Sequence, residues 1–116
     1  MKDIYLNTTW EDGNIKVTIK DVIKYLDEQK IPIKQINVSS LEKILIDQDY
    51  KDKQKDRVSN ANLKYPIIVT VKDGKYKSIL DGNHRTYKAI QQNIKTLPVR
   101  ELNLNVAPEE FKTLFS

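Results

Sequence analysis

The residues best suited to chemistry in this 116-residue chain are five consecutive ones, Asp81-Gly82-Asn83-His84-Arg85. They stand where a β-prone run, residues 75–80, gives way to a helical pattern. Backbone N–H groups at a helix start have no partner inside the helix, and the helix dipole favours negative charge there, so a phosphate group suits both. Gly82 lets the backbone approach a ligand or take a positive φ, while the Asn, His and Arg side chains add hydrogen-bond donors. The pattern predicts a phosphate-binding loop.

The same residues have a structural interpretation. In it they form a tight strand-to-helix turn, with Asp81 as the N-cap and His84 as a polar surface residue. Asp81 also has other roles open to it: it can hold Arg85, accept a hydrogen bond from a ribose hydroxyl or help to carry a cation. Spacing alone leaves these alternatives open.

The elements that must position this loop come from the second half of the chain. The β-branched run 67–71 predicts a strand, Asp73-Gly74 a tight turn, and residues 75–80 the returning strand. After the loop, a helix is expected to continue over 86–92, with Asn93 in the left-handed position that follows a helix.

A third strand is expected over 97–102, and Pro108 opens a short C-terminal helix. Its apolar residues Phe111, Leu114 and Phe115 form either an oligomer or partner surface, or part of the domain's own packing.

The first half predicts a hairpin within residues 4–17 and a helix that starts at Thr18 and runs to about Gln29. A short strand follows within 33–38, and Ser39 and Ser40 begin a second helix. The polar stretch 47–62 is either a surface helix or a loop.

These elements predict an α/β (α+β) fold, in which a small mixed β-sheet is surrounded by helices. A chain of this length buries roughly two-thirds of its unfolded surface, which is enough for one core. We therefore expect residues 1–116 to form a single domain, with 1–35 as an N-terminal extension made of a hairpin and a helix.

Charge is distributed unevenly along the chain. Residues 51–100 hold nine Lys, three Arg and four acidic residues, a balance of +8, whereas residues 1–50 and 101–116 each have a balance of −2. A basic middle segment suits a phosphate-bearing partner such as a nucleotide or DNA. A lysine-rich solvated face is the alternative.

Several function classes are excluded by composition. The chain has no cysteine, which rules out disulfides, zinc-thiolate sites and thiol catalysis, and its single His argues against a histidine-rich metal site. No apolar run approaches the ~20 residues of a membrane span, and the first residues lack the apolar core of a signal peptide. We expect a cytoplasmic protein with no membrane partner.

The order of these motifs resembles the ParB/sulfiredoxin superfamily. The pattern is a Pro-led strand, an Asp-Gly hairpin, a D-G-x-H-R loop, a helix with small residues and a Pro-Val strand. This chain has every part between about residues 64 and 102: Pro66-Ile67-Ile68-Val69, Asp73-Gly74-Lys75-Tyr76, Leu80-Asp81-Gly82-Asn83-His84-Arg85, Ala89 and Pro98-Val99.

The resemblance implies a ParB/sulfiredoxin-like fold that binds a nucleotide, ATP or CTP, and hydrolysis or transfer of a phosphate from such a nucleotide would be expected to use Mg²⁺. The nucleotide-binding residues would be Asp81, Gly82, Asn83, His84 and Arg85, and no residue is assigned as a metal ligand. Asn83 stands where sulfiredoxins have a cysteine, so that chemistry is not expected. The 14 residues after Leu102 leave no room for the helical DNA-binding region of partition ParB proteins, so centromere-type recognition is not expected either.

Free-serine kinases of this superfamily use a carboxylate ahead of the hairpin as a base. Glu42, Asp47 and Asp49 are the candidates here, and Asp47 is preferred because it ends the apolar run 44–46. Phosphoryl transfer needs mainly positioning and charge neutralisation, with a modest proton acceptor. Asp47 and His84 are therefore the expected catalytic residues if the protein is an NTPase or kinase. The alternative is that Asp47 caps a polar helix.

Three functions remain as hypotheses. The first is a small nucleotide-binding protein that hydrolyses a nucleoside triphosphate or transfers its phosphate at the 81–85 loop. The second is a DNA-binding or ParB-like nuclease protein that uses the basic segment. The third is a non-enzymatic module with a protein partner or a second copy of itself. The resemblance associates such a stand-alone domain with a phage or mobile element.

Overall fold

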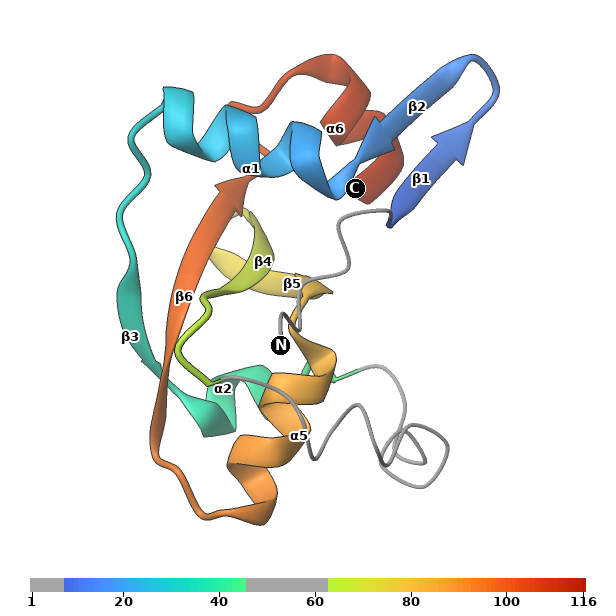
Figure 1. Cartoon of the computed structure of the whole chain (residues 1–116). Coiled ribbons are helices and arrows are strands. Elements are labelled where there is room, and N and C mark those ends of the chain that lie inside the picture. The colour runs from blue at the N-terminus through green and yellow to red at the C-terminus, as the bar shows by residue number, and fades with distance from the viewer. Residues whose placement is uncertain (1–7, 46–62) are drawn as a thin grey trace.

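The computed structural model describes residues 8–45 and 63–116, and its centre is a four-stranded mixed sheet in the order β3-β6-β4-β5 (Figure 1). The strands are β3 (Lys34–Asn37), β4 (Ile67–Lys72), β5 (Lys75–Asp81) and β6 (Thr96–Asn103). The β3–β6 and β4–β5 pairs are antiparallel, and β4 runs parallel to β6. The expected α+β fold with a small mixed sheet is confirmed.

The β4–β5 hairpin forms where the sequence predicted it. Asp73 and Gly74 both have positive φ, +53° and +77°, which suits a two-residue turn between antiparallel strands. Residues 67–70 of β4 are all buried. Their continuous apolar and β-branched run is typical of a strand covered on both faces.

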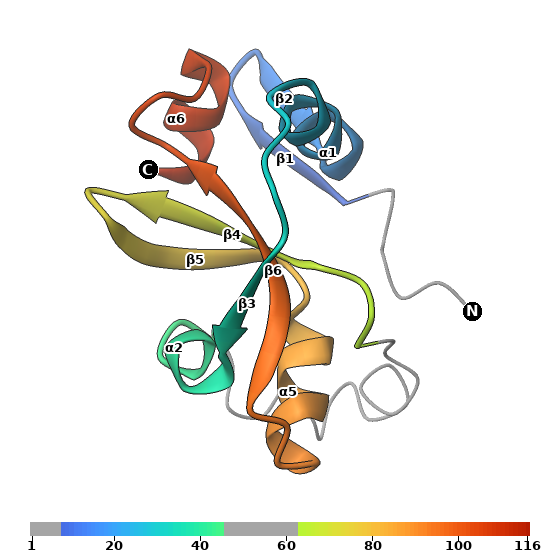
Figure 2. The same ribbon diagram turned by 90° about the vertical axis from the view of Figure 1, so that its left-hand side faces the viewer.

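One face of the sheet is covered by α2 (Val38–Glu42) and α5 (Asn83–Gln91), as Figure 2 shows. Ile67 and Val69 of β4 point into the core on this side, where they join Leu41 of α2 and Ala89 of α5. All four side chains are almost completely buried.

The other face is covered by α1 (Ile19–Glu28), α6 (Glu109–Phe115) and the hairpin of β1 (Thr9–Asp12) and β2 (Ile15–Thr18). The expected N-terminal hairpin and helix are present, and Thr18 and Asp21 form the capping box that starts α1. The apolar C-terminal residues pack on the domain, because the Phe115 ring meets Trp10 edge-on with centroids 5.0 Å apart.

Two helix starts differ from expectation. The second helix begins at Val38, after Asn37, and not after Ser39. Gly82, and not Asp81, occupies the N-cap position of α5. The predicted end of α5 is confirmed, since Asn93 has φ +55° and its N–H donates to Ile90 O. The polar stretch 47–62 lies outside the described residues.

Candidate functional site

Gly82 brings the 81–85 loop against the first residue of β4. Its φ is +117°, and a Cβ added to it would lie 2.5 Å from Ile67 Cδ1 and 3.3 Å from Ile67 Cα. The glycine therefore serves both purposes expected of it, positive φ and close approach, but the partner in that approach is the Ile67 side chain. This contact fixes the position of the loop relative to the sheet.

Asp81 and Arg85 form a buried ion pair beneath the loop. Arg85 Nη2 lies 2.7 Å from Asp81 Oδ2, and the arginine side chain is only 1% exposed. Arg85 Nη1 also donates a 2.8 Å hydrogen bond to Pro66 O, at the entrance to β4. The guanidinium group thus links the end of β5 to the residue before β4. Its positive charge is buried next to the Asp81 carboxylate.

The first turn of α5 offers backbone donors. Both the backbone N–H and the hydroxyl of Thr86 donate to Gly82 O, each at 2.9 Å, which closes this turn. The N–H groups of residues 83–85 precede the first i→i−4 bond of α5, which runs from Thr86 to Gly82, and so they lie at the N-terminal end of the helix dipole. They are the donors expected for a phosphate.

The side chains of Asn83 and His84 are more enclosed than a surface turn requires. His84 is 7% exposed, which contradicts its interpretation as a polar surface residue. The Asn83 side-chain oxygen is buried and accepts no hydrogen bond from the described residues. A buried acceptor in this state is costly, so a ligand or water that donates to it would be favoured.

The five predicted binding residues lie at the junction of β5 and α5: Asp81 ends the strand, Gly82 is the N-cap, and residues 83–85 form the first turn of the helix, which therefore begins earlier than the expected 86. Asp47, the predicted base, lies outside the described residues. Within 8–45 and 63–116, no group of three or more His, Asp or Glu is arranged to hold a metal ion.

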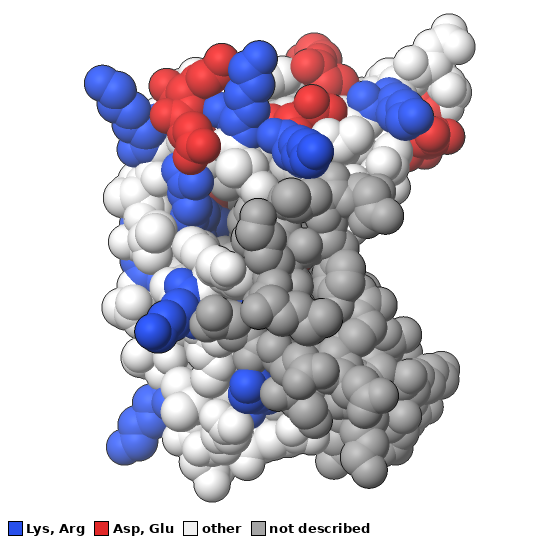
Figure 3. All heavy atoms as spheres, viewed as in Figure 1, with Lys and Arg blue, Asp and Glu red and all other residues white. Residues whose placement is uncertain are grey.

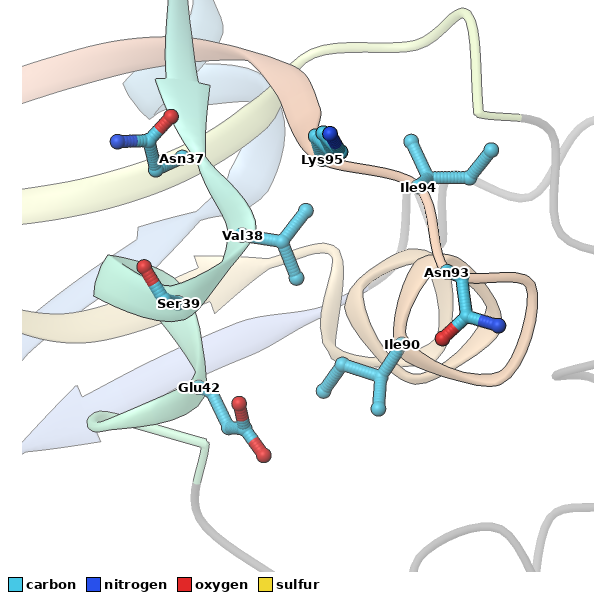
Figure 4. A pocket seen from close by; sticks show the side chains of 8 residues that line it. All are labelled: Asn37, Val38, Ser39, Glu42, Ile90, Asn93, Ile94 and Lys95. Carbon is cyan, nitrogen blue, oxygen red and sulfur yellow. The ribbon is translucent and has the colours of Figure 1, made fainter.

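A hollow that sequence reasoning missed lies at the other end of α5. It has a volume of about 530 Å³ and separates α2 from the connection between α5 and β6 (Figure 4). Ser39 and Glu42 line it from α2, and Asn93, Ile94 and Lys95 line it from that connection. Since α5 is about 13 Å long at 1.5 Å per residue, this hollow is separate from the 81–85 loop.

A second hollow, with a volume of about 450 Å³, lies on the other side of α2. The residues that line it are far apart in the sequence. It is lined by residues of β3, of α2 and the turn after it, and of β5: Ile36, Ser40, Lys43, Ile44, Lys75 and Tyr76. We call it the α2 groove. No local motif marks these residues, because only the packing of α2 across the sheet brings them together.

Tyr76 at this groove is held by an irregularity in β5. The pairing of β4 with β5 shifts by one residue at Lys77, so Tyr76 and Ile79 both pack on the α2 side of the sheet. The Tyr76 hydroxyl donates a 2.6 Å hydrogen bond to Glu101, which is also bound by Lys34 at 3.2 Å. Burial, together with the bond to the Glu101 carboxylate, raises the pKa of Tyr76 well above its usual value.

In the described part of the basic segment, residues 63–100, the exposed basic side chains are lysines. Of its arginines, Arg85 is paired with Asp81, and Arg100 is paired with Asp27 at 2.8 Å. On the face in Figure 3, coloured acidic residues gather at the end that carries α1 and the β1–β2 hairpin, and the opposite end shows only Lys and Arg among the coloured charges. Among the described residues, the charges seen at that end of this face are therefore positive.

Comparison with known proteins finds no protein-family model, no curated protein and no solved structure that matches this chain. Among the described helices, none is long and apolar enough to cross a bilayer.

Proposed function

We propose that this protein binds a nucleoside triphosphate, ATP or CTP, with the phosphates at the start of α5. The proposal is supported by the strand-to-helix junction at residues 81–85 and by the motif order that resembles the ParB/sulfiredoxin superfamily. The single observation that carries it is at Asn83. This residue opens α5, and its buried side-chain oxygen has no hydrogen-bond partner among the described residues.

Each residue of the loop has a distinct role in this proposal. The backbone N–H groups of Asn83 and His84 donate to phosphate oxygens, and the Asn83 oxygen accepts from a ribose hydroxyl or an amino group of the base. Arg85 is a positioning residue, because its buried guanidinium donates to Asp81 and to Pro66 O. Gly82 holds the loop on Ile67.

Mg²⁺ accompanies the triphosphate in this proposal. Mg²⁺ sites commonly use one or two carboxylates together with substrate phosphates. Such a site does not need a group of three or more metal-binding side chains, and the described residues contain no such group. If the bound nucleotide is hydrolysed or its phosphate is transferred, His84 and Asp47 are the proposed catalytic residues. Nucleotide binding without phosphate release would identify a non-enzymatic module.

The test is calorimetric titration of ATP and CTP, with and without Mg²⁺, into the wild type and two matched variants. Asn83→Asp places a negative charge at the proposed phosphate site. Asn93→Asp makes the same change at the other end of α5, where a left-handed Asp is tolerated. We expect Asn83→Asp to weaken triphosphate binding about tenfold or more, which corresponds to about 1.4 kcal/mol. Asn93→Asp should bind as the wild type does.

Two results would contradict this function. One is the absence of binding by either triphosphate to the wild type. The other is equal weakening in the two variants, which would show that overall charge, and not the loop, governs affinity. Where binding is found, release of inorganic phosphate is measured next, with His84→Ala and Asp47→Asn as the variants.

A second candidate function is DNA binding, favoured by the end of the surface in Figure 3 at which the coloured charges are all Lys or Arg. Roughly four lysine–phosphate contacts would make affinity fall about 100-fold between 50 and 200 mM salt. Binding that hardly changes over this range would exclude a lysine-driven DNA interface. The same titration on single- and double-stranded oligonucleotides shows which form is preferred.

A further inference from the structure

The α2 groove combines an apolar floor with a positively charged rim. Ile36, Ile44 and Tyr76 pack against the core while remaining partly exposed, so they offer apolar surface to a ligand. Lys43 and Lys75 stand at the rim, and both are exposed. We propose that this groove binds a small amphiphilic anion, an aromatic ring that carries a phosphate group.

The floor is shaped in advance of binding. The Tyr76 hydroxyl is held by Glu101, which restricts the ring to one position, and Ile36 and Ile44 lie in β3 and directly after α2. A volume of about 450 Å³ falls within the usual range for small-molecule sites. An aromatic ring would remove apolar surface from water here, and the fixed floor would lower the ordering cost.

The charges of the rim select an anion. Neither Lys43 nor Lys75 has an ion-pair partner within the described ranges 8–45 and 63–116, and no acidic residue lines the groove. Glu101 is the nearby carboxylate, but Lys34 and the Tyr76 hydroxyl already bind its two oxygens. The Ser40 hydroxyl adds a neutral donor for a phosphate oxygen.

The groove is separate from the nucleotide loop, so this inference does not rest on the proposed function. Tyr76 and Asp81 are five positions apart along β5, which places the two sites roughly 15 Å apart at the usual rise of a strand. A ligand in the α2 groove would contact neither Asn83 nor His84. The two sites can therefore be tested one at a time.

The experiment is a titration of ¹⁵N-labelled protein with phenyl phosphate, followed by backbone amide shifts. We expect saturable shifts at residues 40, 43–44 and 75–76, whereas inorganic phosphate should bind at least about fivefold more weakly because it leaves the floor uncovered. Lys75→Ala should weaken phenyl phosphate binding about two- to fivefold, the range of one exposed charge contact. Lys72→Ala removes the same charge from the neighbouring position of the hairpin, outside the groove, and should leave affinity unchanged.

Three outcomes would overturn the proposal. The first is that phenyl phosphate causes no saturable shifts at the groove. The second is that it binds no more tightly than inorganic phosphate. The third is that Lys72→Ala weakens phenyl phosphate binding as much as Lys75→Ala does. Shifts confined to residues 82–86 that disappear in Asn83→Asp would place the ligand at the nucleotide loop and so also contradict a groove site. Failure of the protein to bind a nucleotide would, by contrast, leave the result of the phenyl phosphate titration at the groove unaffected.

Discussion

Replacing Gly82 by alanine tests the close packing of the 81–85 loop on β4. Two costs add. An alanine at φ +117° loses about 1–2 kcal/mol from backbone strain. Its Cβ would also lie 2.5 Å from Ile67 Cδ1 and 3.3 Å from Ile67 Cα, and overpacking of this kind costs about 1–3 kcal/mol. We expect Gly82→Ala to lower the free energy of unfolding by about 2–5 kcal/mol, a large part of the stability of a domain this small.

Gly74→Ala is the matched control. Gly74 also has a positive φ, +77°, but a Cβ there would meet no atom within 4 Å, so only the backbone cost of about 1–2 kcal/mol applies. Both variants are measured by urea unfolding followed by circular dichroism, and the difference between them isolates the contact with Ile67.

A rescue variant locates that contact. Ile67→Val removes Cδ1 and should cost about 0.5–1.5 kcal/mol in the wild-type background. In the Gly82→Ala background it should cost nothing or restore stability, because the clashing methyl is gone. The reasoning is refuted if Gly82→Ala destabilises no more than Gly74→Ala, or if Ile67→Val costs the same in both backgrounds.

Two further predictions concern buried polar contacts. Arg85→Ala leaves the Asp81 carboxylate, 10% exposed, without its guanidinium and should cost about 3–5 kcal/mol in urea unfolding. Arg100→Ala removes a pairing with a carboxylate that is 64% exposed and two hydrogen bonds to Ile31 O, so it should cost about 1–2 kcal/mol, and equal losses in the two variants would contradict the burial argument. For Tyr76, whose pKa is raised by folding, the stability of the wild type should fall as pH rises above 10, because the unfolded chain then loses the phenolic proton first. Tyr76→Phe should therefore be less stable than the wild type at pH 7, through loss of the bond to Glu101, and this deficit should shrink or reverse at pH 11; a deficit that stays constant would refute the pKa shift.

Elements with strong local signals were predictable from the sequence. Asp73-Gly74 indicated the hairpin turn, and Thr18 with Asp21 indicated the start of α1. Asn93 indicated the end of α5 in the same way, since each signal lies within a few residues of the feature it controls. Such features can be predicted from a few neighbouring residues without knowledge of the rest of the fold.

The features that escaped prediction depend on packing between distant segments. In a regular strand Tyr76 would share a face with Ser78, but the irregularity at Lys77 turns Tyr76 to the side on which Ile79 packs. A pattern of period two cannot show such an irregularity. Ser39 likewise has the side chain preferred at an N-cap, yet the N-cap of α2 is Asn37, two residues earlier.

At the candidate site too, local features were predictable from the sequence, whereas features that depend on distant segments were not. The sequence indicated that residues 81–85 form one loop, and it allowed a pairing of Asp81 with Arg85, which the structure confirms. That Arg85 is buried and bound to Pro66 O could not be foreseen, because the partner lies 19 positions earlier in the chain. Burial of the loop's arginine changes its role from ligand donor to positioning residue in the proposed function.

The parallel pairing of β4 with β6 has a consequence for how the protein folds. Because β5 and α5 lie between these two strands in the chain, their pairing is a long-range contact, and we expect it to form after the local hairpin and helix. The segment 67–103 is therefore expected to act as one cooperative unit in amide hydrogen exchange, with the amides shared by β4 and β6 opening only with the whole unit. The hairpin of β1 and β2, a separate two-stranded sheet, should exchange earlier and independently.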